Sequence, residues 1–255
     1  MTTMKLRSIG TLLTAFALAA CGGNGGGGAA PLALSQLDGY WTGSVNDTTG
    51  SPLGASTIAR AVVLDNGSAW VFLHDGTQAG QPLLGLATAT LYGVPQGFTG
   101  TGKRYPASGA ALPGDITVSG GAPRGADFDV DVTAGSDRAT LELTYDPTWE
   151  TPAVPAELED DWTFTKAGGT INATWRIAPG GALTGTSTLG CTYTGNVVPY
   201  HVNTAIYTAN ITETCTGTVK QLSGVARLNT AKTHLIFGLT TTDGAEAEAF
   251  AATRQ

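Results

Sequence analysis

The stretch LDGYWT at positions 37–42 recurs as LEDDWT at positions 158–163, an offset of 121 residues. The shared pattern is Leu-x-x-x-Trp-Thr. A repeat this long indicates tandem domains rather than a solenoid of short units. Between the copies, positions 145–155 contain three prolines, which cannot continue a sheet. We therefore expect a first domain over residues 35–146, a stiff linker over 147–156 and a second domain over 157–255.

Strand and turn signals follow each copy of the repeat. Apolar runs at 61–64 and 69–73 flank Asn66-Gly67, a dipeptide typical of tight hairpin turns. At 127–132 acidic and apolar residues alternate, which places three carboxylates on one face of a strand and apolar side chains on the other. The second half carries about seven or eight strand signals in about 100 residues, the spacing of a sandwich or barrel.

Composition supports an all-β fold. The 255 residues include 36 Gly and 12 Pro, and only 13% are charged. This much glycine with so few charges disfavours long helices and coiled coils. The net charge of −7 lacks the positive surface that a phosphate backbone requires, so we expect no nucleic-acid partner.

We expect two consecutive small antiparallel β-barrels, because a meander of hairpins can close without leaving open edges. An immunoglobulin-like sandwich would place a tryptophan between its cysteines, and the two cysteines of the second half enclose none. The motif Gly39-x-Trp41 resembles the opening of lipocalins, which implies a barrel closed at one end by the tryptophan. The second copy has Asp160 in place of the glycine. The alternative is that Trp41 and Trp162 are simply large core residues.

The N-terminus has the proportions of a bacterial signal peptide over residues 1–20. Lys5 and Arg7 precede an uncharged stretch at 8–20 that is too short for a membrane-spanning helix. Positions 18–21 are LAAC, which resembles the lipobox of bacterial lipoproteins. The resemblance implies cleavage before Cys21, attachment of diacylglycerol to its sulfur and acylation of the new amine. The alternative is an ordinary secretory signal.

We predict that residues 21–34 form a lipidated, flexible, Gly-rich tether. Nine or ten residues of this composition have a mean reach of roughly 15–20 Å. Among lipoproteins, Gly22 in place of Asp after the lipidated Cys21 resembles the pattern for outer-membrane sorting, on either the periplasmic or the cell-surface face. The overall plan resembles uncharacterised tandem-barrel lipoproteins of Gram-negative bacteria.

The remaining two cysteines, Cys191 and Cys215, predict a disulfide, since an even pair in an exported chain is most often oxidised. Closing this 25-residue loop would constrain the unfolded chain by roughly 3.5 kcal/mol in the chain-entropy model. The alternative, a redox-active pair, lacks Cys-x-x-Cys spacing.

Neither a catalytic nor a metal site is indicated by the histidines. His74, His201 and His234 lack the spacing of zinc ligands, and we expect each in a loop or at the surface. The chain also lacks a Gly-x-Ser-x-Gly nucleophile elbow.

The acidic strand at 127–132 offers three carboxylates that could bind Ca²⁺. A calcium loop of the EF-hand type needs Gly at its sixth position and Glu at its twelfth, where this chain has Val132 and Arg138. We favour a solvated outer face of the barrel.

These patterns predict a membrane-anchored, non-catalytic envelope lipoprotein that acts as a binding module for a small apolar ligand or a protein partner. We expect no enzyme activity, no cofactor and no metal. One alternative is a surface adhesin-like, immune-evasion or structural lipoprotein. A second is a periplasmic enzyme inhibitor similar to lysozyme inhibitors.

Overall fold

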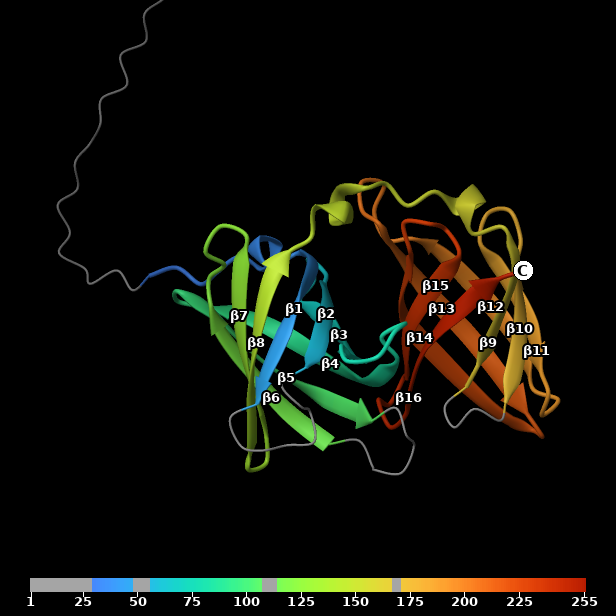
Figure 1. Cartoon of the computed structure of the whole chain (residues 1–255), viewed down its shortest axis with the longest axis horizontal. Coiled ribbons are helices and arrows are strands. Elements are labelled where there is room, and N and C mark those ends of the chain that lie inside the picture. Colours follow the sequence, from blue (N-terminus) through green and yellow to red (C-terminus); the bar gives the residue numbers. More distant parts are fainter. Residues whose placement is uncertain (1–28, 48–55, 107–113, 167–170) are drawn as a thin grey trace, which may run out of the picture.

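The computed structural model describes residues 29–47, 56–106, 114–166 and 171–255 of the chain. They form two consecutive closed barrels, each of eight antiparallel strands, which lie side by side (Figure 1). The predicted all-β class and the tandem barrels are therefore confirmed. No helix within the described ranges is long and apolar enough to cross a bilayer.

Barrel 1, the first of the two, has an up-and-down topology in which every strand pairs with its neighbours in the sequence. It closes where β1 pairs with β8, from Trp41↔Tyr145 to Asp47↔Ala139. Its strands are β1 (Gly39–Asp47), β2 (Thr57–Val63), β3 (Ser68–Asp75), β4 (Leu83–Val94), β5 (Gly97–Pro106), β6 (Gly114–Gly121), β7 (Asp127–Ala134) and β8 (Asp137–Tyr145).

Barrel 2 repeats this topology, but its closure is shorter. Strand β9 pairs with β10 along its whole length, whereas among the described residues it meets β16 only at Thr253↔Thr163 and Arg254↔Trp162. The strands are β9 (Asp160–Thr165), β10 (Asn172–Ile177), β11 (Ala182–Ser187), β12 (Thr192–Pro199), β13 (Ile206–Cys215), β14 (Thr218–Leu228), β15 (His234–Thr241) and β16 (Ala247–Arg254).

The repeated Leu-x-x-x-Trp motif builds the same plug at one end of each barrel. In each copy a 3₁₀ turn, η1 (Leu34–Gln36) or η3 (Pro155–Glu157), precedes a fully buried leucine. The indole Nε1 of Trp41 donates to the Leu37 carbonyl at 3.0 Å, and the same bond joins Trp162 to Leu158 at 2.8 Å. Both tryptophans are therefore buried core residues that also tie the chain across a barrel end.

The segment before barrel 1 is attached to this plugged end. Leu32 donates its N–H to the Val94 carbonyl at 3.0 Å, and Pro31 bridges to Pro95. The chain thus enters barrel 1 at the end where β4 meets β5. The predicted tether is bound to the barrel from Pro31 onward.

The linker between the barrels contains helical turns. Its 3₁₀ turn η2 (Pro147–Glu150) is capped by Asp146, whose carboxylate accepts from the Thr148 N–H at 2.9 Å. Trp149 from this turn is buried between the barrels. The prolines therefore start short turns that cross from one barrel to the other, along the upper edge in Figure 1.

The barrels are joined by an apolar interface. It forms where outward side chains of β2, β3 and β4 meet those of β13, β14, β15 and β16. Figure 1 shows β14 and β16 on the side of barrel 2 that faces barrel 1. Phe72 packs against Gly238, where a Cβ atom would lie 2.7 Å from the ring. The buried members of this cluster are Tyr40, Val62, Leu64, Phe72, Leu86, Tyr105, Trp149, Ile206 and Val225.

A side chain at Gly238 is expected to push the barrels apart. We predict that Gly238→Val lowers the free energy of unfolding by about 1–3 kcal/mol, the usual cost of overpacking. Urea denaturation measures the loss. Adding Phe72→Ala should recover part of it by making room, and a double variant that loses the sum of both effects would contradict the contact.

Candidate functional site

The interior of barrel 1 contains an apolar cavity of about 110 Å³. Inward positions of all eight strands line it, and six of the lining residues are alanines and six are valines. The alanines are Ala61, Ala69, Ala87, Ala89, Ala134 and Ala139.

The cavity exists because small residues share neighbouring positions. Ala69 on β3 is in register with Ala89 on β4, which is in register with Gly102 on β5. A side chain is not possible at Gly102, where a Cβ atom would meet the Thr88 carbonyl oxygen at 1.8 Å. The wall is thus thin in the middle of three adjacent strands, and the buried aromatic side chains of this core are only Trp41, Phe98 and Phe128.

Barrel 2 is filled by its own aromatic side chains. Phe164 and Phe250 stack with their ring centroids 4.0 Å apart, and Trp175 meets Phe250 edge-on at 5.3 Å. Its buried aromatic residues are Trp162, Phe164, Trp175, Tyr193, Tyr207, Phe237 and Phe250. The two barrels have the same number of strands, but aromatic side chains fill the centre of barrel 2 and a cavity occupies the centre of barrel 1.

The two ends of the cavity differ in polarity. At the plugged end, Trp41 packs on Phe128 with ring centroids 4.8 Å apart. At the other end Arg104 on β5 faces Asp137 on β8, with 3.4 Å between Nη1 and Oδ2, and both side chains are exposed. Charged groups therefore surround the mouth, which lies opposite the end where the N-terminal segment attaches.

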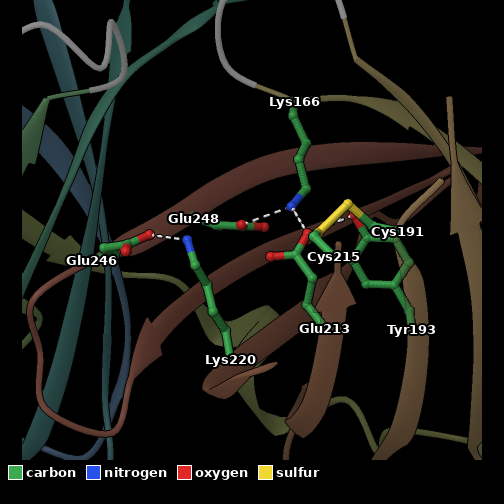
Figure 2. The surroundings of a disulfide bond; sticks show 8 residues. All are labelled: Lys166, Cys191, Tyr193, Glu213, Cys215, Lys220, Glu246 and Glu248. Carbon is green, nitrogen blue, oxygen red and sulfur yellow. Dashed lines mark hydrogen bonds and ion pairs between the residues drawn. A yellow bond between two sulfur atoms is a disulfide. The ribbon is translucent and has the colours of Figure 1, made fainter. Parts of the chain in front are cut away.

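A buried ionic cluster lies at the rim of barrel 2, beside the disulfide (Figure 2). Lys166 binds the carboxylates of both Glu213 and Glu248, the latter at 2.8 Å. The Tyr193 hydroxyl donates to Glu213 at 2.7 Å. One oxygen of Glu248 is buried without a partner among the described residues.

Burial and the shared lysine set the pKa values of this cluster. Burial raises the pKa of Glu248, and Lys166 offsets this only in part. Burial also acts to raise the pKa of Glu213, but hydrogen bonds from Lys166 and Tyr193 hold it below its ordinary value. Burial acts to lower the pKa of Lys166, but the two carboxylates raise it above its usual range.

The predicted cysteine pair is present at disulfide distance, with 2.06 Å between the sulfurs of Cys191 and Cys215. It joins the end of β13 to the turn before β12. These cysteines and Glu213 are the group of potential metal-ligating side chains found in the described part of the chain. In this state the sulfurs bind each other and the carboxylate binds Lys166 and Tyr193.

A second polar cluster joins the barrels near the linker. The Tyr200 hydroxyl donates to Asp65, and His201 Nε2 lies 3.3 Å from the other oxygen of the same carboxylate. Asp38 lies nearby with one oxygen buried and unpartnered among the described residues. Burial and the charge of Asp65 raise the pKa of Asp38 to about 6. The His201–Asp65 pair thus ties a loop of barrel 2 to a turn of barrel 1.

The raised pKa of Asp38 predicts a stability that depends on pH. Its folded pKa of about 6 exceeds the ordinary 3.8, so its contribution is present below pH 3.8 and is lost as pH rises through 6. We expect Asp38→Asn to stabilise the protein at pH 8 by up to about 1 kcal/mol, since the carboxylate is partly solvated, and to change little at pH 4. Denaturation at both pH values tests this, and equal effects at both would contradict it.

The histidine predictions are partly corrected. His201 is exposed in a loop, and His234 is exposed at the start of β15. His74 was expected in a loop or at the surface but is buried at the end of β3. It points out of barrel 1 toward barrel 2, and the carbonyl oxygen of Gln81 lies 2.8 Å from its Nδ1.

The acidic strand and the predicted anchor complete the sequence-based candidates. On β7 the three aspartates are exposed and Phe128 lies inside, as the alternation predicts. Thr140 donates to Asp131 at 2.8 Å, and Thr144 to Asp127 at 3.4 Å. The predicted signal peptide and Cys21 lie outside the described residues.

No protein-family model matches the chain, and no curated protein sequence matches it. What the molecule does therefore has to follow from its own geometry.

Proposed function

We propose that the chain is a membrane-anchored, non-catalytic envelope lipoprotein whose first barrel binds a small apolar ligand. The observation that carries the proposal is the apolar cavity of about 110 Å³ in barrel 1, beside a barrel 2 that is packed with aromatic side chains. An engineered cavity of about 150 Å³ with similar lining stays dry and binds benzene or xenon. The cavity of barrel 1 suits a ligand of that size class.

The end of barrel 1 at which the cavity opens is consistent with a membrane anchor at the N-terminus. The described chain joins barrel 1 at the plugged end, whereas Arg104 and Asp137 lie at the mouth. A lipid on Cys21 would therefore hold the plugged end toward the membrane and leave the mouth pointing away. Tether and cavity would then serve one purpose, the capture of a small apolar molecule beside the membrane.

Binding is tested with benzene as the probe. The chain carrying Cys21→Ser is titrated with benzene and followed by NMR, and we expect saturable shifts of the methyl groups that line the cavity. The variant Ala89→Phe places a ring in the cavity and should abolish saturation. Its matched control is Ala182→Phe, which adds the same ring on the exposed face of β11.

Two results would overturn ligand binding by barrel 1. One is unsaturable, nonspecific benzene binding by the parent chain. The other is unchanged binding by a folded Ala89→Phe variant, with folding judged by its cooperative urea transition. With binding established, native mass spectrometry of the protein purified from its own host shows what co-purifies.

The anchor is tested separately by detergent partition. We expect the exported chain to enter the detergent phase and Cys21→Ser to move it to the aqueous phase, because two or more acyl chains are needed for stable anchoring. A Cys21→Ser product that stays in the detergent phase would contradict lipidation at this residue.

A further inference from the structure

A cleft of about 810 Å³ lies between the two barrels, outside both interiors. Barrel 1 contributes Arg60 from β2, His74 from β3 and the loop at 78–83. Barrel 2 contributes residues of β15 and β16, together with Thr165 at the end of β9. In Figure 1, β16 lies on the side of barrel 2 that faces barrel 1.

The two walls of the cleft differ in their apolar content. The wall from barrel 1 carries the guanidinium of Arg60, an imidazole and the amides of Gln78 and Gln81. The wall from barrel 2 presents the apolar side chains of Ile236, Ala249 and Ala251, and it also carries the polar residues Thr165, Asn229 and His234. No aspartate or glutamate is among the described residues that line it, in a chain whose net charge is −7.

Among the described residues, the seam of barrel 2 is only partly paired beside this wall. The described part of β9 pairs with β16 only at Thr253↔Thr163 and Arg254↔Trp162, so the ladder does not extend to Thr165 and Ala251. Thr165 and Ala251, on either side of this unpaired stretch, both line the cleft. Phe250 itself points into barrel 2, where its ring stacks on Phe164.

Arg60 is held at the cleft by an unusual loop residue. Its Nη2 donates to the Gln81 side-chain oxygen at 2.5 Å, and the Gln81 carbonyl oxygen lies 2.8 Å from His74 Nδ1. Gln81 has a φ of 46°, a left-handed conformation that disfavours residues other than glycine. The guanidinium carries five N–H donors, so most of them remain for a ligand.

His74 adds an unsatisfied polar atom on the same wall. Because Nδ1 faces a carbonyl oxygen it carries the proton, which leaves Nε2 as a lone-pair acceptor. The residue is only 6% exposed, and Nε2 has no partner among the described residues. A water molecule brought in with an anion can donate one hydrogen to Nε2 and the other to the anion.

We propose that this cleft binds an organic carboxylate with an apolar body, whose head group pairs with Arg60 and whose body lies on β15 and β16. Arginine forms two parallel hydrogen bonds with a carboxylate, which a neutral head group cannot accept as strongly. The outward side chains of Ile236, Ala249 and Ala251 supply the hydrophobic contact. This site is independent of the cavity inside barrel 1.

The test uses decanoate as the probe and the full chain carrying Cys21→Ser. Isothermal titration calorimetry below the micelle concentration compares decanoate with decanol, which lacks the charge, and with acetate, which lacks the apolar body. We expect saturable binding of decanoate, affinity for decanol lower by about tenfold or more, and no measurable binding of acetate.

Two variants locate the head group and the apolar body. Arg60→Met should weaken decanoate binding by about tenfold while leaving decanol binding nearly unchanged. Its matched control is Arg176→Met, which removes the same charge from an exposed ion pair with Asp161 on the far wall of barrel 2. Ala251→Glu places a negative charge on an exposed position of the apolar wall and should also weaken decanoate.

The outcomes also separate this site from the cavity of barrel 1. Ala89→Phe should leave decanoate binding unchanged, and Arg60→Met should leave benzene binding unchanged. Equal affinity for decanol and decanoate, or equal losses in Arg60→Met and Arg176→Met, would overturn the cleft proposal. Loss of decanoate binding in Ala89→Phe would place the carboxylate inside the barrel and overturn it as well.

Discussion

Replacing Lys166 by methionine is expected to lower the free energy of unfolding by about 3–5 kcal/mol, the cost of removing one partner from a buried ionic cluster. Lys166 binds both Glu213 and Glu248, and Glu213 is only 4% exposed. Without the lysine, Glu213 retains the Tyr193 hydroxyl, and no described residue bonds Glu248. Methionine keeps the length and apolar stem of the side chain, so the loss reports the missing charge.

The matched control is Lys220→Met in the same barrel. Lys220 pairs with Glu246 (Figure 2). The Glu246 side chain is 58% exposed, and such pairs contribute about 0–1 kcal/mol. Urea denaturation at pH 8 measures both variants. In Lys166→Met the pKa values of the unpaired carboxylates rise above their unfolded values, so the loss should shrink as pH falls toward 4. Equal losses for the two variants, or no pH dependence, would contradict the role given to Lys166.

The fold could be predicted largely from local patterns. Alternation at 127–132 correctly placed Phe128 inside barrel 1 and the aspartates outside. The Asn66-Gly67 turn joins β2 to β3, with Gly67 at a φ of 84°. These features are local, because side-chain direction in a strand depends on period two and turn geometry on a few residues.

The candidate site could be predicted only in part. Each inward alanine of barrel 1 follows from alternation, but a cavity requires that small residues meet across strands, as Ala69 and Ala89 do. Whether two alanines meet depends on the register between neighbouring strands, which could not be predicted from the sequence. His74 was placed wrongly because its outward direction predicts solvent, and a second barrel that covers this face cannot be read from the strand itself.

The sequence of β13 contains a sign of the ionic cluster in barrel 2 that the sequence analysis did not use. Inward positions of β13 run through Ala209, Ile211, Glu213 and Cys215, so the alternation itself places a carboxylate inside the barrel. An inward carboxylate in an apolar series requires a cation, because an unpaired buried charge is costly. The cation is Lys166, which directly follows β9 and lies 47 residues before Glu213 in the sequence. Only closure of the barrel brings the two residues together.

The two barrels share a topology and a sequence motif but differ in their interiors. The same plug, with an indole bonded to a carbonyl four residues before it, begins both barrels. The interior of barrel 2 is packed with aromatic side chains, and its rim carries an ionic cluster and a disulfide. The interior of barrel 1 contains a cavity. A void loses packing energy. We therefore expect barrel 1 to depend for stability on its interface with barrel 2, which contains Phe72 and Gly238.

Removing the disulfide should therefore weaken the barrel that supports the other. We expect the double variant Cys191→Ala, Cys215→Ala to lower the free energy of unfolding by about 3 kcal/mol, because the closed 25-residue loop restricts the unfolded chain. Alanine suits the buried position of Cys191 because it adds no polar atom there. Urea denaturation without reductant measures the loss.

Reductant supplies the internal control for this prediction. Dithiothreitol should lower the stability of the parent chain toward that of the double variant and leave the double variant itself unchanged. If barrel 2 supports barrel 1, the single cooperative transition should move as a whole, and methyl signals of barrel 1 should be lost at the same urea concentration as those of barrel 2. Separate transitions would show that the interface does not couple the barrels, and an unchanged midpoint would show that the cross-link constrains little of the unfolded chain.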